Sequence, residues 1–274
     1  KYQGIYFMKK TLIALAVAAS AAVSGSAMAA TWTPNLAGVN NFELGGTLTP
    51  KANVTPWEAM IGDAVKNLDS DIKKGQSKVT MLTKSAIPVL GIRTVSNTAF
   101  VADMYQSATP NIDYGTAVDL GATVDSKAPL TLEVKDSTTD LPIGTLRTSL
   151  YVAAMQAYTN QTSSKSGMNP LIGEAGGLFE GGLPTQSAAI GDVNQVMPTL
   201  DAISPEFGVN FDKRGQSTVG NPGKGTIGGS NILYSAYYGS GIKAGESIVI
   251  NLTQPIGATA ITWKATLPIT ISYQ

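Results

Sequence analysis

The sequence predicts an all-β protein, built as an antiparallel sandwich or barrel. Short apolar, β-branched or alternating runs recur along the chain, and turns rich in Gly, Pro, Asp and Asn separate them. Charged residues make up only 14% of the chain, against roughly 25% in ordinary soluble proteins. The chain has no cysteine, so core burial or partners must supply the stability that disulfides give many exported proteins.

The first part of the sequence is typical of an export signal. Met8-Lys9-Lys10 is a basic start, residues 12–23 are apolar and rich in alanine, and Ala27-Met28-Ala29 is a cleavage signal. The apolar run is shorter than the roughly 18–20 residues that a membrane-spanning helix needs. We therefore expect a signal peptide over 8–29, an upstream scar over 1–7, and a mature exported chain that begins at residue 30.

The composition of the mature chain disfavours nucleic-acid binding and catalysis. Loss of three lysines with residues 1–29 leaves 16 basic residues (19 minus 3) against 19 acidic ones, a net charge of about −3, and no long basic patch. Histidine, the commonest general base and metal ligand, is absent. A glycosidase with two distant carboxylates is the best enzyme alternative, but no acidic residue stands in a distinctive context. We expect no enzyme, no cofactor and no metal.

Eight runs have the composition of strands, and two stretches depart from it. The predicted strands are 78–83, 87–94, 117–124, 130–135, 144–152, 232–238, 247–253 and 260–273. Apolar residues with helical spacing predict a helix over 57–72, weakened by Gly62. A long insertion over 153–211 is predicted to contain a helix near 186–203, broken or kinked at Pro198. We expect one domain over 51–274 and see no internal repeat.

Both ends of the mature chain are unusually well specified for pairing. Near the start, Phe42, Leu44, Gly46 and Leu48 occupy every second position of a strand-like run. At the other end, a second alternating strand places Leu267, Ile269, Ile271 and Tyr273 on one face. Chain ends usually fray because little ties them down. This pattern indicates an assembly subunit, although 42–48 could also be an ordinary first strand of its own sheet.

Five segments, in this order, resemble major subunits of chaperone–usher fimbriae of the kappa class, made by enterotoxigenic enteric bacteria. They are residues 8–16, 42–49, 144–146, 178–183 and 263–273. The resemblance implies an incomplete immunoglobulin-like sandwich that lacks its last strand, with a short helical insertion in the middle. It also implies an exported, adhesive protein of a surface fimbrium or pilus, and hence a role in virulence.

The resemblance assigns roles to the two ends. Residues 30–50 would be a donor-strand extension whose Phe42, Leu44, Gly46 and Leu48 fill the open groove of an identical subunit. The strand with Leu267, Ile269, Ile271 and Tyr273 would edge that groove and pair with a periplasmic chaperone before an outer-membrane usher assembles the polymer. Pro268 limits which side of this strand a partner can use, because proline has no N–H.

The resemblance also places receptor binding in the inserted middle region. The expected partner is a host glycoconjugate, and the candidate residues, which could stack on a sugar or hydrogen-bond its hydroxyls, are Tyr158, Asn169, Glu174, Phe179 and Glu180. A phenylalanine in the context of Phe179 is more often a core residue, the Asn and Glu side chains could simply be solvated, and the sugar is not indicated. The alternative function is a monomeric secreted β-sandwich that binds carbohydrate.

Overall fold

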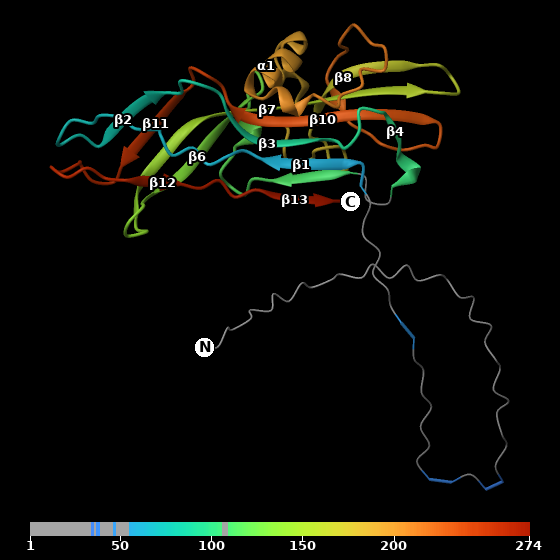
Figure 1. Cartoon of the computed structure of the whole chain (residues 1–274), viewed down its shortest axis with the longest axis horizontal. Coiled ribbons are helices and arrows are strands. Elements are labelled where there is room, and N and C mark those ends of the chain that lie inside the picture. Colours follow the sequence, from blue (N-terminus) through green and yellow to red (C-terminus); the bar gives the residue numbers. More distant parts are fainter. Residues whose placement is uncertain (1–33, 36, 39–45, 48–54, 106–108) are drawn as a thin grey trace, which may run out of the picture. The chain divides into compact units, whose positions relative to one another are not determined.

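The computed structural model describes residues 34–35, 37–38, 46–47, 55–105 and 109–274, and divides the chain into two units, 1–50 and 51–274. The second unit is built mostly from antiparallel strands (Figure 1). The strands are β1 (Trp57–Ile61), β2 (Lys78–Leu82), β3 (Ile87–Thr94), β4 (Phe100–Val101), β5 (Pro110–Asp113), β6 (Lys127–Asp136), β7 (Pro142–Asn160), β8 (Ser166–Ile172), β9 (Gly223–Lys224), β10 (Ile232–Ile242), β11 (Ser247–Leu252), β12 (Trp263–Ala265) and β13 (Thr270–Tyr273). The all-β expectation is confirmed.

The long strand β7 organises the unit, because it has different neighbours along its length. One edge pairs first with β6 and then with β8, and the other pairs first with β11 and then with β10. The main path of the sheet runs β1-β3-β10-β7-β11-β2. β5 and β13 form a separate two-stranded ribbon, and β12 adds to β6.

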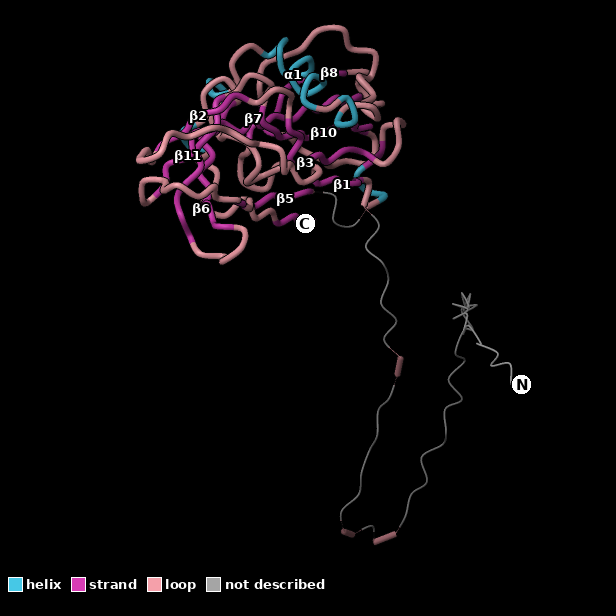
Figure 2. The backbone as a smooth tube through the Cα atoms, turned by 60° about the vertical axis from the view of Figure 1, so that its left-hand side comes forward, coloured by secondary structure: helices cyan, strands magenta, loops and turns pink. Residues whose placement is uncertain are grey.

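Both faces of the sheet are covered where β7 pairs with β10. Every residue from 151 to 157 is therefore buried. Even-numbered residues there, such as Val152, join a core shared with β3, β5 and β6. Odd-numbered residues, such as Met155, pack under the helix α1 (Val196–Ile203). Figure 2 shows α1 on one side of the sheet and β5 on the other.

The middle insertion holds α1 and three of the five short 3₁₀ turns of the described chain. These turns are η3 (Ser187–Ala189), η4 (Val193–Gln195) and η5 (Pro205–Phe207), and η1 (Ala102–Met104) and η2 (Leu120–Ala122) lie earlier in the chain. The predicted helix is thus confirmed in its second half only. Pro198 does not break it, because Pro198 lies in the first turn, where the backbone N–H has no partner within the helix.

Two sequence predictions are wrong. The stretch 57–72 is β1 followed by residues without regular secondary structure, because Trp57 to Ile61 pair in register with β3. The stretch 117–124 contains η2 and two isolated bridges rather than a strand, since Asp119 accepts a hydrogen bond from the Ala122 N–H and closes a turn. Within the described residues, no helix combines the length and apolar character needed to cross a bilayer.

Candidate assembly surface and receptor region

The C-terminal segment alternates without interruption between exposed and half-buried residues. Its even-numbered residues from 264 to 274 are exposed, and its inward-facing residues are half-buried apolar side chains: Trp263, Ala265, Leu267, Ile269, Ile271 and Tyr273. The last four pack against the main core, and burial raises the pKa of the Tyr273 hydroxyl. Inward-facing residues of a completed sandwich are normally buried, so this segment lacks cover on one side.

One edge of β13 is paired and the other is open in the described part of the chain. Thr109 and Gln274 exchange two backbone hydrogen bonds of 3.0 Å, which fixes the phase of the ladder with β5. Residues 270, 272 and 274 therefore direct their N–H and C=O groups to β5. Ile271 and Tyr273 direct theirs to the opposite edge, where no described strand pairs.

Pro268 occupies a position whose backbone N–H would point toward β5. Its lack of an N–H therefore removes no hydrogen-bond donor from the open edge. Its position has the same parity as Thr270 and Ser272, whose N–H groups point toward β5. A Cβ added to Gly115, just after β5, would lie 3.9 Å from the Pro268 ring. The inward-facing residues from Leu267 to Tyr273 all keep a backbone N–H. The limit that Pro268 was expected to set therefore does not apply to the open edge.

A second open edge belongs to β1. Val95 donates to the Pro56 carbonyl oxygen at 2.9 Å and Gly62 donates to the Val89 carbonyl oxygen at 3.0 Å, so even-numbered residues of β1 face β3. Ala59 and Ile61 direct their backbone groups to the other edge, which has no strand partner among the described residues. The Ile61 side chain is 58% exposed although the strand continues from buried Trp57.

These two edges lie on the same side of the unit, opposite α1, in both whole-chain views (Figures 1 and 2). We call the set formed by Ile61, Leu267, Ile269, Ile271 and Tyr273 the acceptor surface. It combines partly exposed apolar side chains with backbone donors and acceptors that lack a strand partner in the described chain. These are the two features that allow a sheet edge to accept another strand.

The expected donor residues Phe42, Leu44 and Leu48 lie outside the described residues. Gly46 is described and exposed, and a Cβ added to it would meet nothing within 4 Å. Its expected role as the shallow point of a donor strand stays a prediction.

Two of the expected receptor residues lie on the β7–β8 pair. Tyr158 lies opposite Gly167, and Asn169 lies opposite Gln156, which is buried. Tyr158 and Asn169 are both half-buried. Gly167 is required beside Tyr158, because a Cβ there would lie 2.9 Å from the tyrosine ring.

Two others lie on the loop after β8. Glu174 is exposed, and the Glu180 carboxylate accepts a hydrogen bond from the Gly176 N–H at 2.6 Å. Lys224 donates to the carbonyl oxygen of Ala175 at 2.6 Å and lies over the same loop. Sequence reasoning did not single out Lys224, and no motif marks it.

Phe179 is a core residue, so the expectation that its ring offers a face to a sugar needs correction. It is fully buried, and its ring packs edge-on against Trp57 with centroids 5.6 Å apart and in a tilted arrangement against Tyr238 at the same separation. Its φ of 58° is left-handed, a strained conformation for a bulky side chain, and the Phe179 N–H donates to the Pro110 carbonyl oxygen at 2.8 Å. Phe179 thereby anchors the loop to β5.

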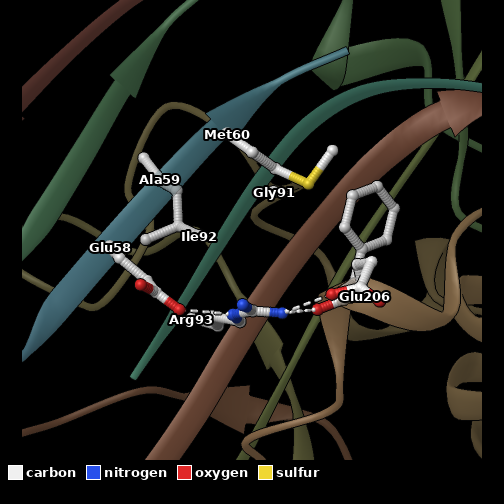
Figure 3. Close-up of a pocket in the computed structure, with 8 residues that line it drawn as sticks. Glu58, Ala59, Met60, Gly91, Ile92, Arg93 and Glu206 are labelled. Carbon is white, nitrogen blue, oxygen red and sulfur yellow. Dashed lines mark hydrogen bonds and ion pairs between the residues drawn. The ribbon is translucent and has the colours of Figure 1, made fainter. Parts of the chain in front are cut away.

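The structure also contains a charged pocket that sequence reasoning missed. Arg93 on β3 contacts Glu58 at 2.6 Å and Glu206 of η5 at 3.2 Å, and it also donates to the Glu206 carbonyl oxygen (Figure 3). The pocket has a volume of about 160 Å³, and Met60 and Phe207 supply its apolar wall. These contacts connect residues far apart in the chain, so no local pattern announces them.

The fold and the site define a structural β-sandwich subunit rather than an enzyme. The family model described as "Fimbrial, major and minor subunit" matches residues 8–274, and the chain belongs to this family. It is 29% identical to the F41 fimbrial protein and 28% identical to the K88 fimbrial protein AD, both of Escherichia coli, over 97% of this chain and the full length of each relative. The expected resemblance to fimbrial subunits of enteric bacteria is confirmed.

Proposed function

We propose that copies of this protein polymerise by donor-strand exchange, in which residues 42–48 of one copy pair with the acceptor surface of the next. The observation that carries the proposal is the unbroken alternation of 263–273, in which apolar residues face inward yet stay half-exposed beside an unpaired strand edge. A strand laid along that edge would gain backbone hydrogen bonds and cover the exposed side chains.

The chemistry of the proposed donor matches this surface. Phe42, Leu44 and Leu48 would fall on one face of an added strand, and complete burial of such a side chain contributes about 1.5–3 kcal/mol. Gly46 would pass where the surface is shallow. Three buried side chains and a row of hydrogen bonds are a large contribution compared with the stability of a typical domain, about 5–15 kcal/mol.

The same open edge calls for protection before assembly. An apolar strand edge without a partner promotes aggregation, and a periplasmic chaperone that pairs with Leu267, Ile269, Ile271 and Tyr273 would prevent it. We propose that the chain crosses the periplasm in such a complex. An outer-membrane usher would then exchange the chaperone for the donor strand and place the polymer at the cell surface.

The test compares mature protein with a variant that lacks residues 30–50, supplied with a free peptide of residues 33–50. We expect SDS-resistant polymers from the intact protein, and an unstable monomer that the peptide rescues from the truncated one. A stable intact monomer that ignores the peptide would contradict the proposal and favour a secreted carbohydrate-binding sandwich.

Adhesion to a host glycoconjugate is the second part of the proposal. Its support is the half-buried pair Tyr158 and Asn169 on β7 and β8, with Glu174 and Glu180 on the following loop. A glycan array read with intact fibres tests this. Asn169→Ala and Glu174→Ala should lower binding and leave polymer yield unchanged, whereas Asp103→Ala, on exposed η1, is the matched control. Equal binding by all variants would contradict the assignment.

A further inference from the structure

Five of the ten exposed large apolar residues in the described chain lie in two sets at two ends of the second unit, outside the acceptor surface. At one end Val95, Met104 and Val209 are 57%, 74% and 60% exposed, and at the other Leu141 and Ile261 are 63% and 36% exposed. We call these sets the proximal patch and the hairpin patch. Exposed apolar patches commonly mark contacts between proteins.

The proximal patch surrounds the point where the described body begins. The Val95 N–H donates to the Pro56 carbonyl oxygen at 2.9 Å, close to the start of β1. The Asn210 side-chain amide donates to the Val95 carbonyl oxygen at 3.2 Å, so Val209, the preceding residue, lies near Val95. η1, which ends at Met104, lies near the start of β1 in both whole-chain views (Figures 1 and 2).

The hairpin patch lies at the turn between β6 and β7, next to the start of β12. The backbone N–H of Asp136 donates to the Leu141 carbonyl oxygen at 3.0 Å, and the backbone N–H of Ser137 donates to the Thr262 carbonyl oxygen at 2.8 Å. These bonds bring Leu141 and Ile261 to the same end. An ion pair of 2.7 Å between Lys264 and Asp140 borders them.

The two patches lie at opposite ends of the C-terminal segment. Tyr273 lies opposite Pro110, which accepts from Phe179, whose ring packs on Trp57. The Tyr273 end is therefore the proximal end. The Trp263 end adjoins the hairpin patch, and ten residue steps of extended chain separate the two ends, about 33 Å.

We propose that, in the polymer, the proximal patch of each copy docks on the hairpin patch of the copy that accepts its donor strand. The inference rests on the proposed donor-strand exchange. Seven residue steps separate Leu48 from Thr55, so the start of the donor's own body lies within about 25 Å of the end of its inserted strand. The sequence length alone therefore holds the two bodies close together.

The direction of the inserted strand selects the hairpin patch. Apart from the two-residue parallel pair of β8 and β9, all described strand pairs are antiparallel, and antiparallel pairing is slightly the more stable arrangement. A donor antiparallel to β13 leaves Leu48 at the Trp263 end. The contact is then head-to-tail between different patches, which builds an open filament rather than a closed pair.

The short tether makes even a weak contact effective. A linker of this length holds the patches at a local concentration on the order of millimolar, so an apolar contact too weak to form between free monomers would be occupied in the polymer. Occupied contacts would make the filament stiffer than a string of tethered domains.

The absence of cysteine from the chain allows a direct test with engineered pairs. Full-length protein carrying Val209→Cys and Ile261→Cys is assembled into fibres, treated with a short bis-maleimide and boiled in SDS. We expect a ladder of covalent multimers. The matched control joins Val209→Cys with Leu82→Cys, because Leu82 is 65% exposed on β2, lies opposite Ser247 and belongs to neither patch; this pair should give no ladder. Val95→Cys with Leu141→Cys repeats the test.

The other outcomes overturn the inference in distinguishable ways. Crosslinked dimers from Val209→Cys alone would mean that proximal patches meet each other and that the donor runs parallel to β13. Normal SDS-resistant fibres without a ladder from either pair would leave donor-strand exchange standing and show that the bodies are only tethered. Failure of the unmodified protein to polymerise would remove both proposals.

Discussion

Ile271 of β13 lies directly opposite Ile112 of β5, and the Ile112 N–H donates to the Glu180 carbonyl oxygen at 2.8 Å, on the edge of β5 that faces away from β13. Opposite residues of such a pair direct their backbone groups outward in opposite directions. Ile271 therefore presents its N–H and C=O to the open edge, while its side chain faces the core. This relationship defines the acceptor surface.

The acceptor surface should be sensitive to charge on its inward face only. Ile271→Glu places a carboxylate where a donor strand would exclude water, which is costly, so we expect peptide 33–50 to bind the truncated protein at least tenfold more weakly. Thr270→Glu, on the exposed face, should change the affinity less than twofold. Fluorescence titration measures both, and circular dichroism checks that each variant is folded. Equal effects of the two changes would contradict the assigned face.

The donor peptide should show the same alternation. Leu44→Ala removes most of a side chain worth about 1.5–3 kcal/mol when buried, so affinity should fall roughly tenfold to a hundredfold. Glu43→Gln lies on the opposite face and should change affinity little. Competition titration with a labelled wild-type peptide gives both values. Weaker binding by the Glu43 variant than by the Leu44 variant would reverse the predicted face.

Positions 91 and 239 should require glycine, because the Phe207 ring occupies the space that a side chain there would need. A Cβ on Gly91 would lie 2.6 Å from Phe207, and a Cβ on Gly239 would lie 2.5 Å from it. Phe207 is buried beneath α1, so Gly91→Ala should lower the free energy of unfolding by about 1–3 kcal/mol through overpacking. In a Phe207→Leu background the loss should be smaller. A urea-unfolding mutant cycle measures this coupling, and purely additive losses would contradict the clash.

Stability should fall in alkali through a buried tyrosine. Burial raises the pKa of Tyr114 to about 12, although hydrogen bonds of 2.8 Å with Ser240 and Tyr238 lower it in part. An unfolded tyrosine ionises near 10, so between about pH 10 and 12 only the unfolded chain loses this proton and the free energy of unfolding decreases.

The Tyr114→Phe variant tests this alkaline effect. It loses the buried hydroxyl and should be less stable at pH 8, yet its stability should decline less steeply from pH 10 to 12. Urea unfolding at several pH values measures both slopes, with Tyr105→Phe as the control because Tyr105 is only half-buried, whereas Tyr114 is buried. Parallel slopes for Tyr114→Phe and wild type would contradict the assignment.

Much of the strand content could be predicted because alternation is local. The predicted 87–94 coincides with β3, and 78–83 and 247–253 extend one residue beyond β2 and β11. The stretch 57–72 was misjudged because Trp57, Met60 and Ile61 also fit a helical spacing. Pairing with β3, 29 to 37 residues away along the chain, overrides that spacing.

The candidate sites also contain some features that local sequence predicts and others that only tertiary packing sets. The inward set from Leu267 to Tyr273 follows from the sequence, because side chains alternate across a strand whatever its neighbours. Phe179 shows the limit: its sequence context is compatible with a sugar platform, and only the packing of Trp57 and Tyr238 around it makes it core.

The sequence by itself determined the all-β class, the alternating C-terminal strand and the resemblance to fimbrial subunits, because composition and period-two patterning are carried by near neighbours. Only the tertiary structure decided which strand edges stay open, on which side Pro268 lies, and where the exposed apolar patches gather. Those features depend on pairing and packing between segments as distant as β5 and β13, and no local pattern records the partner that a strand finds or lacks.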